Sequence, residues 1–229
     1  MRVYCLSIVA ALALSACGEE AAAPEPARAA LDIDEPLPVM GPERVILAFG
    51  DSLFAGYNVG PGESFIERME NSLRAQGINA RLVDGAVSGD TSAAALQRLT
   101  FLLDNIDAEP ELAIVELGGN DLLRSLVPEE TRANIGAVLE ELDRRGIAVL
   151  LMGMRAPPNL GQGFQTEFDA LYAGLAREHD VALVPFFLEP IYDKPDLLQA
   201  DHVHPTARGI EELVADTVDD VMAALPEND

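Results

Sequence analysis

Residues 45–53, VILAFGDSL, decide the fold class of this 229-residue chain. Val45 to Phe49 is a short apolar run that Gly50 ends, as expected for a strand buried on both faces. Asp51 and Ser52 follow directly, where such a strand would stop. A strand that is apolar on both faces is typical of a parallel sheet with helices on either side.

The same pattern recurs along the rest of the chain. Further apolar runs predict a short edge strand at 81–83 and strands at 112–117, 147–152 and 181–186. Apolar residues at helical spacing separate these runs, around 65–73, 95–103, 135–142 and 168–175. A last helix is expected from Pro205, as its first residue, to about Leu225. Strands that alternate with helices predict an α/β chain, a three-layer α/β/α sandwich around about five parallel strands.

Polar clusters follow the predicted strands. They are Gly50-Asp51-Ser52-Leu53, Ala86-Val87-Ser88-Gly89-Asp90-Thr91, Gly118-Gly119-Asn120-Asp121 and Asp201-His202-Val203-His204-Pro205. In open parallel sheets, ligands bind beyond the carboxyl ends of the strands. Four clusters at four such positions predict a site at that edge.

These clusters resemble the four blocks of the SGNH hydrolases, also called the GDSL esterase/lipase family, in the family's order from Arg44 onward. The strings FGDSLFAGY, SGDTSAAAL and VELGGNDLLR are most similar to its periplasmic thioesterase/lysophospholipase/arylesterase branch. The resemblance implies a flavodoxin-like SGNH fold, with Ser52 as nucleophile, Gly89 and Asn120 in the oxyanion hole, and Asp201 with His204 completing the triad. His202 departs from it, since a small residue is more usual there.

The residues support this chemistry independently. A serine nucleophile needs a base, and of the three histidines His204 lies in a strand-end loop three residues after Asp201. His179 is predicted near a helix C-terminus, as a solvent-facing cap, and His202 at the surface or the substrate rim. The backbone N–H groups of Ser52 and Gly89 and the side chain of Asn120 would then bind the oxyanion. Asp51 and Asp121 are interpreted as acceptors that organise their loops.

Other chemistries lack their signatures. No Gly-x-Ser-x-Gly occurs, which excludes the α/β-hydrolase elbow, and the glycine patterns of nucleotide-binding loops are absent too. We therefore expect no cofactor. Asp201, His202 and His204 could be drawn as a metal site, but further ligands are missing nearby, so no metal is expected.

The substrate is predicted from apolar residues around the polar clusters. Leu53, Asp121, Leu122 and Pro157 are expected to contact it, and the loop 154–163 to form a mobile wall of an acyl groove. An apolar edge suits a small-molecule acyl ester or thioester. A carbohydrate O-deacetylase with the same catalytic residues remains an alternative, and so does a lipid-binding scaffold lipoprotein with an inactive site.

The N-terminal residues predict a secretion signal and a lipid anchor. Residues 1–16 have a short basic start and an apolar stretch typical of a signal peptide, and Leu14-Ser15-Ala16-Cys17 resembles a bacterial lipobox. Cys17 would then carry lipid, residues 17–43 would form an Ala/Pro/Glu-rich tether, and 44–229 the hydrolase domain. An ordinary secretory signal is the alternative, and residues 31–40 could also dock on the domain as an arm. The expected location is the bacterial cell envelope, facing the periplasm.

The formal net charge of −24 limits the partners. A chain this acidic is repelled by phosphate backbones and anionic lipid surfaces, so no nucleic acid is expected and the membrane is reached only through the lipid. A monomer is the favoured assembly.

Overall fold

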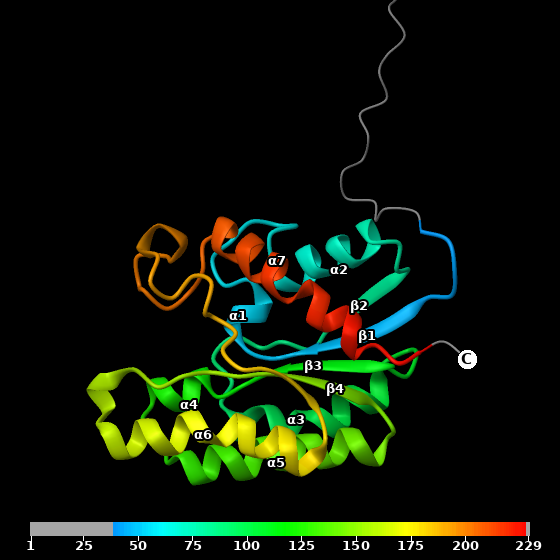
Figure 1. The fold of residues 1–229 in the computed structure, drawn as a ribbon. Coiled ribbons are helices and arrows are strands. Elements are labelled where there is room, and N and C mark those ends of the chain that lie inside the picture. The colour runs from blue at the N-terminus through cyan, green and yellow to red at the C-terminus, as the bar shows by residue number, and fades with distance from the viewer. Residues whose placement is uncertain (1–38, 228–229) are drawn as a thin grey trace, which may run out of the picture. The chain divides into compact units, whose positions relative to one another are not determined.

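Five strands form one parallel sheet in the order β2-β1-β3-β4-β5 in the computed structural model, which describes residues 39–227 (Figure 1). The strands are β1 (Arg44–Phe49), β2 (Ala80–Asp84), β3 (Leu112–Glu116), β4 (Ala148–Met152) and β5 (Ala182–Val184). All four neighbouring pairs are parallel. The predicted signal peptide, the lipidated Cys17 and the tether as far as residue 38 lie outside the described residues.

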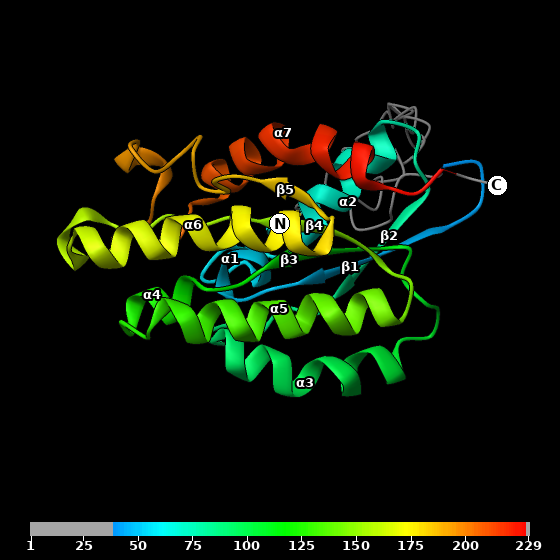
Figure 2. The ribbon, with the colours of Figure 1, turned by 60° about the horizontal axis from the view of Figure 1, so that its bottom comes forward.

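Helices connect and cover the strands. They are α1 (Ser52–Ala55), α2 (Phe65–Ala75), α3 (Ser92–Asn105), α4 (Gly119–Leu123), α5 (Pro128–Arg144), α6 (Gln162–His179) and α7 (Ala207–Ala224), with short 3-10 turns η1 (Pro158–Leu160) and η2 (Pro195–Leu197). Figure 1 shows α2 and α7 packed together on one face, and Figure 2 brings α3, α5 and α6 forward on the other. The predicted α/β/α sandwich is confirmed. Between residues 39 and 227, no helix is both long and apolar enough to cross a bilayer.

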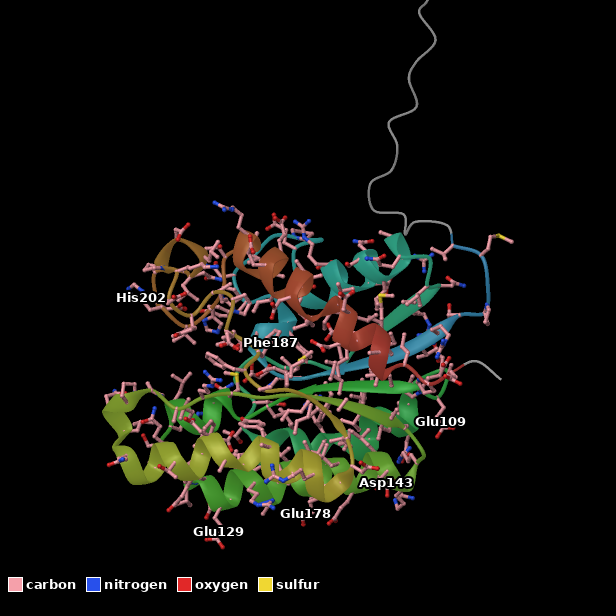
Figure 3. The ribbon with its side chains drawn as sticks, in the orientation of Figure 1. Glu109, Glu129, Asp143, Glu178, Phe187 and His202 are labelled. Atoms are coloured by element: carbon pink, nitrogen blue, oxygen red, sulfur yellow. The ribbon has the colours of Figure 1, made fainter. Side chains whose placement is uncertain are left out.

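The core supports the start of α1. All six residues of β1 are buried, among them Val45 to Phe49, the apolar run that predicted a strand covered on both faces. Beneath α1, Phe54 stacks on Phe65 with ring centroids 4.5 Å apart, and Phe187 meets both rings edge-on. Figure 3 shows Phe187 between the sheet and the α7 layer, whereas Glu129 and Glu178 project outward from the opposite helices. Because packed aromatic rings tolerate little displacement, this cluster holds the turn after β1 in place.

The strand order places a topological switch point between β1 and β3. From β1 the chain first adds β2 on one side and then β3 on the other. The loops after β1 and β3 therefore run in opposite directions and leave a crevice at the carboxyl ends of these strands. The clusters at residues 50–53 and 118–121 flank that crevice.

Several predicted boundaries are wrong. Pro205 is not the first residue of the last helix, because Thr206 is its N-cap and accepts a hydrogen bond from the Gly209 N–H at 3.1 Å. The predicted strand 181–186 is shorter, since Pro185 directly after β5 has no N–H for the ladder. Gly163 belongs to α6 and not to the preceding loop. The short helices α1 and α4 begin inside two of the polar clusters, and no periodic pattern predicted them.

Candidate active site

A chain of hydrogen bonds joins Ser52, His204 and Asp201. The Ser52 Oγ lies 2.8 Å from His204 Nε2, and His204 Nδ1 lies 2.7 Å from Asp201 Oδ2. Ser52 is the first residue of α1, and the two other residues come from the loop before α7, about 150 positions later. Such a chain can transfer a proton from the hydroxyl to the imidazole while the carboxylate stabilises the imidazolium.

The carboxylate of Asp201 is fixed by its own loop. Its Oδ1 accepts hydrogen bonds from the backbone N–H groups of Val203 and His204, both at 3.0 Å. The hydrogen bond to His204, followed by these two, lowers the pKa of Asp201 to about 2. Asp201 is therefore ionised throughout the neutral range and holds the proton of His204 on Nδ1.

Gln199 and Tyr57 hold the His204 loop against the loop that follows α1. The Gln199 side chain donates to the carbonyls of Tyr57 and Pro205, both at 2.8 Å, and its backbone N–H donates to the carbonyl of His204 at 2.7 Å. The Tyr57 ring lies 4.3 Å from the His204 ring, centroid to centroid. These contacts restrain the imidazole opposite Ser52.

Asp51 caps α1 and links it to the cluster after β3. Its Oδ1 accepts from the Leu53 N–H at 3.0 Å, as predicted for a loop-organising carboxylate. Its Oδ2 accepts from the Asn120 side-chain amide at 2.8 Å, a contact that the sequence did not predict. Asn120 thus uses one N–H to hold its position and keeps its second for another acceptor.

Glu116 lies under this turn. It is fully buried at the end of β3, and its Oε2 accepts from the Asp51 backbone N–H at 3.3 Å. Burial, and then the neighbouring Asp51 carboxylate, raise the pKa of Glu116 well above its usual range. Glu116 therefore holds a proton more readily in the folded chain than in the unfolded one. Sequence reasoning missed this residue, although a lone acid inside the apolar run 112–117 was a visible signal.

The structure supports one of the two roles predicted for Asp121 and not the other. Its carboxylate is buried and accepts hydrogen bonds from the backbone N–H and hydroxyl of Ser92 and from the Thr131 hydroxyl. It is therefore a hydrogen-bond acceptor that joins α3, α4 and α5, which agrees with the prediction that Asp121 is a structural acceptor. It does not line the cavity described below, so the expected substrate contact is wrong. The requirement for acceptors at the N-terminus of α3 explains its position.

Gly89 lies in the loop between β2 and α3, in a left-handed conformation with φ +89°. Arg124 donates to its carbonyl at 2.9 Å. Arg98 joins this loop to the end of β1, because its guanidinium donates to Asp90 at 2.6 Å and to the carbonyls of Gly85 and Gly50 at 2.7 and 3.2 Å. The turn before α1 and the loop that carries Gly89 are thus connected through one half-buried cation.

A cavity of about 470 Å³ opens beside Ser52. Leu53, Leu122 and Pro157 line it, together with Asn120 and the rim residue His202. Their contact with a substrate stays a prediction. Figure 3 shows His202 at the end of the molecule where α1 and α4 begin. The remaining wall is mostly apolar and includes Met154, Ala156, Phe186, Leu188, Tyr192 and Leu198.

The loop after β4 forms one wall, as expected. Residues 154–158 line the cavity, and the Ala156 N–H donates to Asp169 at 2.8 Å, which ties the loop to α6. The motion predicted for this loop stays a prediction. His179 is half-buried in the last turn of α6 and lies outside the site. Between residues 39 and 227, no three His, Cys, Asp or Glu side chains are grouped to hold a metal ion.

Comparison with known proteins identifies relatives along most of the chain. Residues 48–211 match the GDSL-like lipase/acylhydrolase family. The chain is 35% identical to Esterase TesA of Pseudomonas aeruginosa over 162 residues, 71% of this chain and 80% of that protein. It is 36% identical to the thioesterase 1/protease 1/lysophospholipase L1 of Escherichia coli over 171 residues, 75% of this chain and 79% of that protein.

A solved structure shares the fold as well. The crystal structure of AlinE4, an SGNH-hydrolase family esterase, aligns with a TM-score of 0.70 and 62% sequence identity over 82% of this chain and all of that one. The parallel sheet, the four clusters and these similarities agree with one another.

Proposed function

The chain belongs to the GDSL-like lipase/acylhydrolase family and is an ester hydrolase, and we propose that Ser52 is its nucleophile, His204 its base and Asp201 the residue that orients the base. The observation that carries this proposal is the continuous hydrogen-bonded chain from Asp201 through His204 to Ser52 Oγ, at 2.7 and 2.8 Å. We propose carboxylic esters and thioesters as its substrates.

The reaction proceeds through an acyl-enzyme. Ser52 Oγ attacks the carbonyl carbon while His204 Nε2 takes its proton, and a tetrahedral oxyanion forms. Collapse of this intermediate breaks the bond to the alcohol or thiol, which leaves with the proton from His204. Water, deprotonated by the same nitrogen, then attacks the Ser52 ester. A second tetrahedral intermediate releases the carboxylic acid, and the proton returns to Ser52.

The oxyanion is bound by the backbone N–H groups of Ser52 and Gly89 and the side-chain amide of Asn120. The hydrogen bond from Asn120 to Asp51 supports this role, because it fixes the amide and leaves one N–H free for the substrate oxygen. The contacts of Arg124 and Arg98 with the Gly89 loop support it from the other side. Donors held in position before the reaction stabilise the oxyanion without further reorganisation.

The cavity favours acyl chains over acetyl groups. A volume of about 470 Å³ with mostly apolar walls holds far more than a methyl group. Medium or long acyl esters and thioesters, including aryl esters and lysophospholipids, fit a cavity of this volume and lining. The named activities of the Escherichia coli relative, thioesterase and lysophospholipase, agree with this choice. A carbohydrate O-deacetylase, the alternative, would need little of this volume.

Initial rates on p-nitrophenyl esters from acetate to palmitate test the proposal, with wild type compared with Ser52→Ala. We expect the rates to peak above acetate and Ser52→Ala to abolish them, whereas Ser125→Ala, a matched change outside the cavity, leaves them intact. A strict preference for acetate would favour the deacetylase. Full activity of Ser52→Ala would exclude the proposed nucleophile.

We propose further that Cys17 is lipidated and that the enzyme faces the periplasm at the end of the 17–43 tether. The lipobox-like LSAC and the acidic, proline-rich stretch after it support this location. Labelled palmitate should enter the wild-type chain and not Cys17→Ser. Equal labelling of the two would contradict the anchor and leave the hydrolase unaffected.

A further inference from the structure

The wall of the catalytic cavity contains one exposed arginine. Arg155 follows β4 in the loop that lines the cavity, and it is the only Lys or Arg among the lining residues that the structure describes. Its guanidinium carbon lies 4.8 Å from the centroid of the Phe186 ring, another lining residue. An arginine at this distance over an aromatic face is attracted to it, so the side chain is held at the cavity wall.

Arg155 has no acidic partner among residues 39–227, although the chain carries a net charge of −24. Seven other arginines do pair with carboxylates within 4.0 Å; they are Arg44, Arg68, Arg81, Arg98, Arg132, Arg144 and Arg145. The lining also contains one carboxylate, that of Asp51, but it is buried and occupied by Leu53 and Asn120. The cation on the wall is therefore not neutralised by the protein.

The contact with Phe186 involves no carboxylate and leaves the guanidinium free to bind an anion. Guanidinium binds carboxylate and phosphate through paired N–H donors, and such charge-assisted hydrogen bonds are stronger than neutral ones. A cation that opens onto the same cavity as Ser52 Oγ, in a protein that repels anions elsewhere on its surface, discriminates between substrates at short range.

We propose that Arg155 forms an anion subsite of the catalytic cavity, and that the preferred substrates are acyl esters or thioesters that carry a carboxylate or phosphate group. This inference rests on the proposed function, because it concerns a substrate already bound at Ser52. The anionic group belongs either to the acyl part or to the alcohol part of the ester.

Two pairs of substrates separate these cases. In the first pair the acyl part differs: mono-p-nitrophenyl adipate ends in a carboxylate, and p-nitrophenyl hexanoate is its neutral counterpart. In the second pair the alcohol part differs: the hexanoyl ester of 4-hydroxybenzoate is anionic, and that of methyl 4-hydroxybenzoate is neutral. For each pair, the ratio of kcat/KM, anionic over neutral, is measured in wild type, Arg155→Gln and Arg155→Lys.

We expect Arg155→Gln to lower the ratio about tenfold or more in one of the pairs, and Arg155→Lys to retain part of it, because a point charge replaces the paired donors. The pair that responds identifies the part of the substrate that carries the anion. Arg177→Gln is the matched control, an exposed arginine on α6 that does not line the cavity, and it should change neither ratio.

Unchanged ratios in both pairs would overturn the subsite. An equal loss on the anionic and neutral members would also overturn it, since that result means a packing role for Arg155. Neither result would affect the proposed nucleophile, which the Ser52→Ala comparison on p-nitrophenyl hexanoate tests separately.

Discussion

The side-chain amide of Asn120 donates a hydrogen bond to the buried carboxylate of Asp51 across 2.8 Å. These residues follow β3 and β1, the two strands on either side of the topological switch point. The same Asp51 carboxylate caps α1 and thereby positions Ser52. A single carboxylate thus sets the distance between the proposed nucleophile and the proposed oxyanion donor.

Asn120→Ala should lower kcat about 10²–10³-fold, because it removes one donor to the oxyanion, and should change KM much less. Steady-state kinetics on p-nitrophenyl hexanoate measure both constants. Asn105→Ala, on the exposed end of α3, is the control and should have no effect on either. A rise in KM with kcat unchanged would mean that Asn120 only binds the ground state.

Asp201→Asn should lower kcat about 10³–10⁴-fold, since the amide no longer stabilises the imidazolium and permits the wrong His204 tautomer. The pKa of Asp201 is about 2, so wild type keeps this carboxylate ionised at every pH of an ordinary assay. The loss should therefore persist across a pH–rate profile. Asp193→Asn, an exposed aspartate in the segment between β5 and η2, is the control. A loss confined to acidic pH would contradict the role.

Glu116→Gln should change how stability depends on pH. The pKa of Glu116 is raised well above its ordinary value of 4.5, chiefly by burial, so the folded chain keeps a proton that the unfolded chain has lost. Unfolding then releases this proton, and the stability of wild type falls as pH rises from about 4.5 towards the raised pKa, by up to about 1.4 kcal/mol per pH unit. Glutamine has no such proton.

Urea unfolding at about pH 5 and about pH 7 measures this effect. The free energy of unfolding of Glu116→Gln, relative to wild type, should increase between the two values. Glu129→Gln, an exposed change at the start of α5, should follow wild type. Parallel curves for Glu116→Gln and wild type would show that Glu116 titrates in the folded protein as it does in the unfolded chain.

Gly118→Ala should destabilise the protein through two effects. Gly118 has φ +106°, and a Cβ there would overlap the hydroxyl of Tyr172, which donates to the Leu117 carbonyl at 2.9 Å. The backbone strain alone is worth about 1–3 kcal/mol. Tyr172→Phe removes the overlapping oxygen, so the alanine should cost less in that background.

A double-mutant cycle on thermal or urea unfolding measures the coupling, which we expect at about 0.5–3 kcal/mol. Additive effects would indicate that the backbone conformation of Gly118, and not the Tyr172 hydroxyl, excludes a side chain. Because Gly118 precedes α4, the alanine should also lower kcat by displacing Asn120.

The sequence by itself determined the layers of the fold and the residues of the proposed triad. The apolar run at 45–49 is typical of a strand covered on both faces, and a parallel sheet brings every cluster after a strand to one edge. His204 was identified without structure because a serine needs a base and Asp201 lies within reach along the chain. These inferences use local patterns and a general rule of sheet topology.

The tertiary structure alone decided which polar groups meet. The link between Asp51 and Asn120, the buried Glu116 beneath them and the unpaired Arg155 on the cavity wall depend on which side chain occupies which side of each loop. Asp121 shows the limit clearly: it is adjacent to Asn120, yet it turns inward to Ser92 while Asn120 lines the cavity. Neighbouring residues on a tight turn point in different directions, so distances between distant loops follow only from the packed fold.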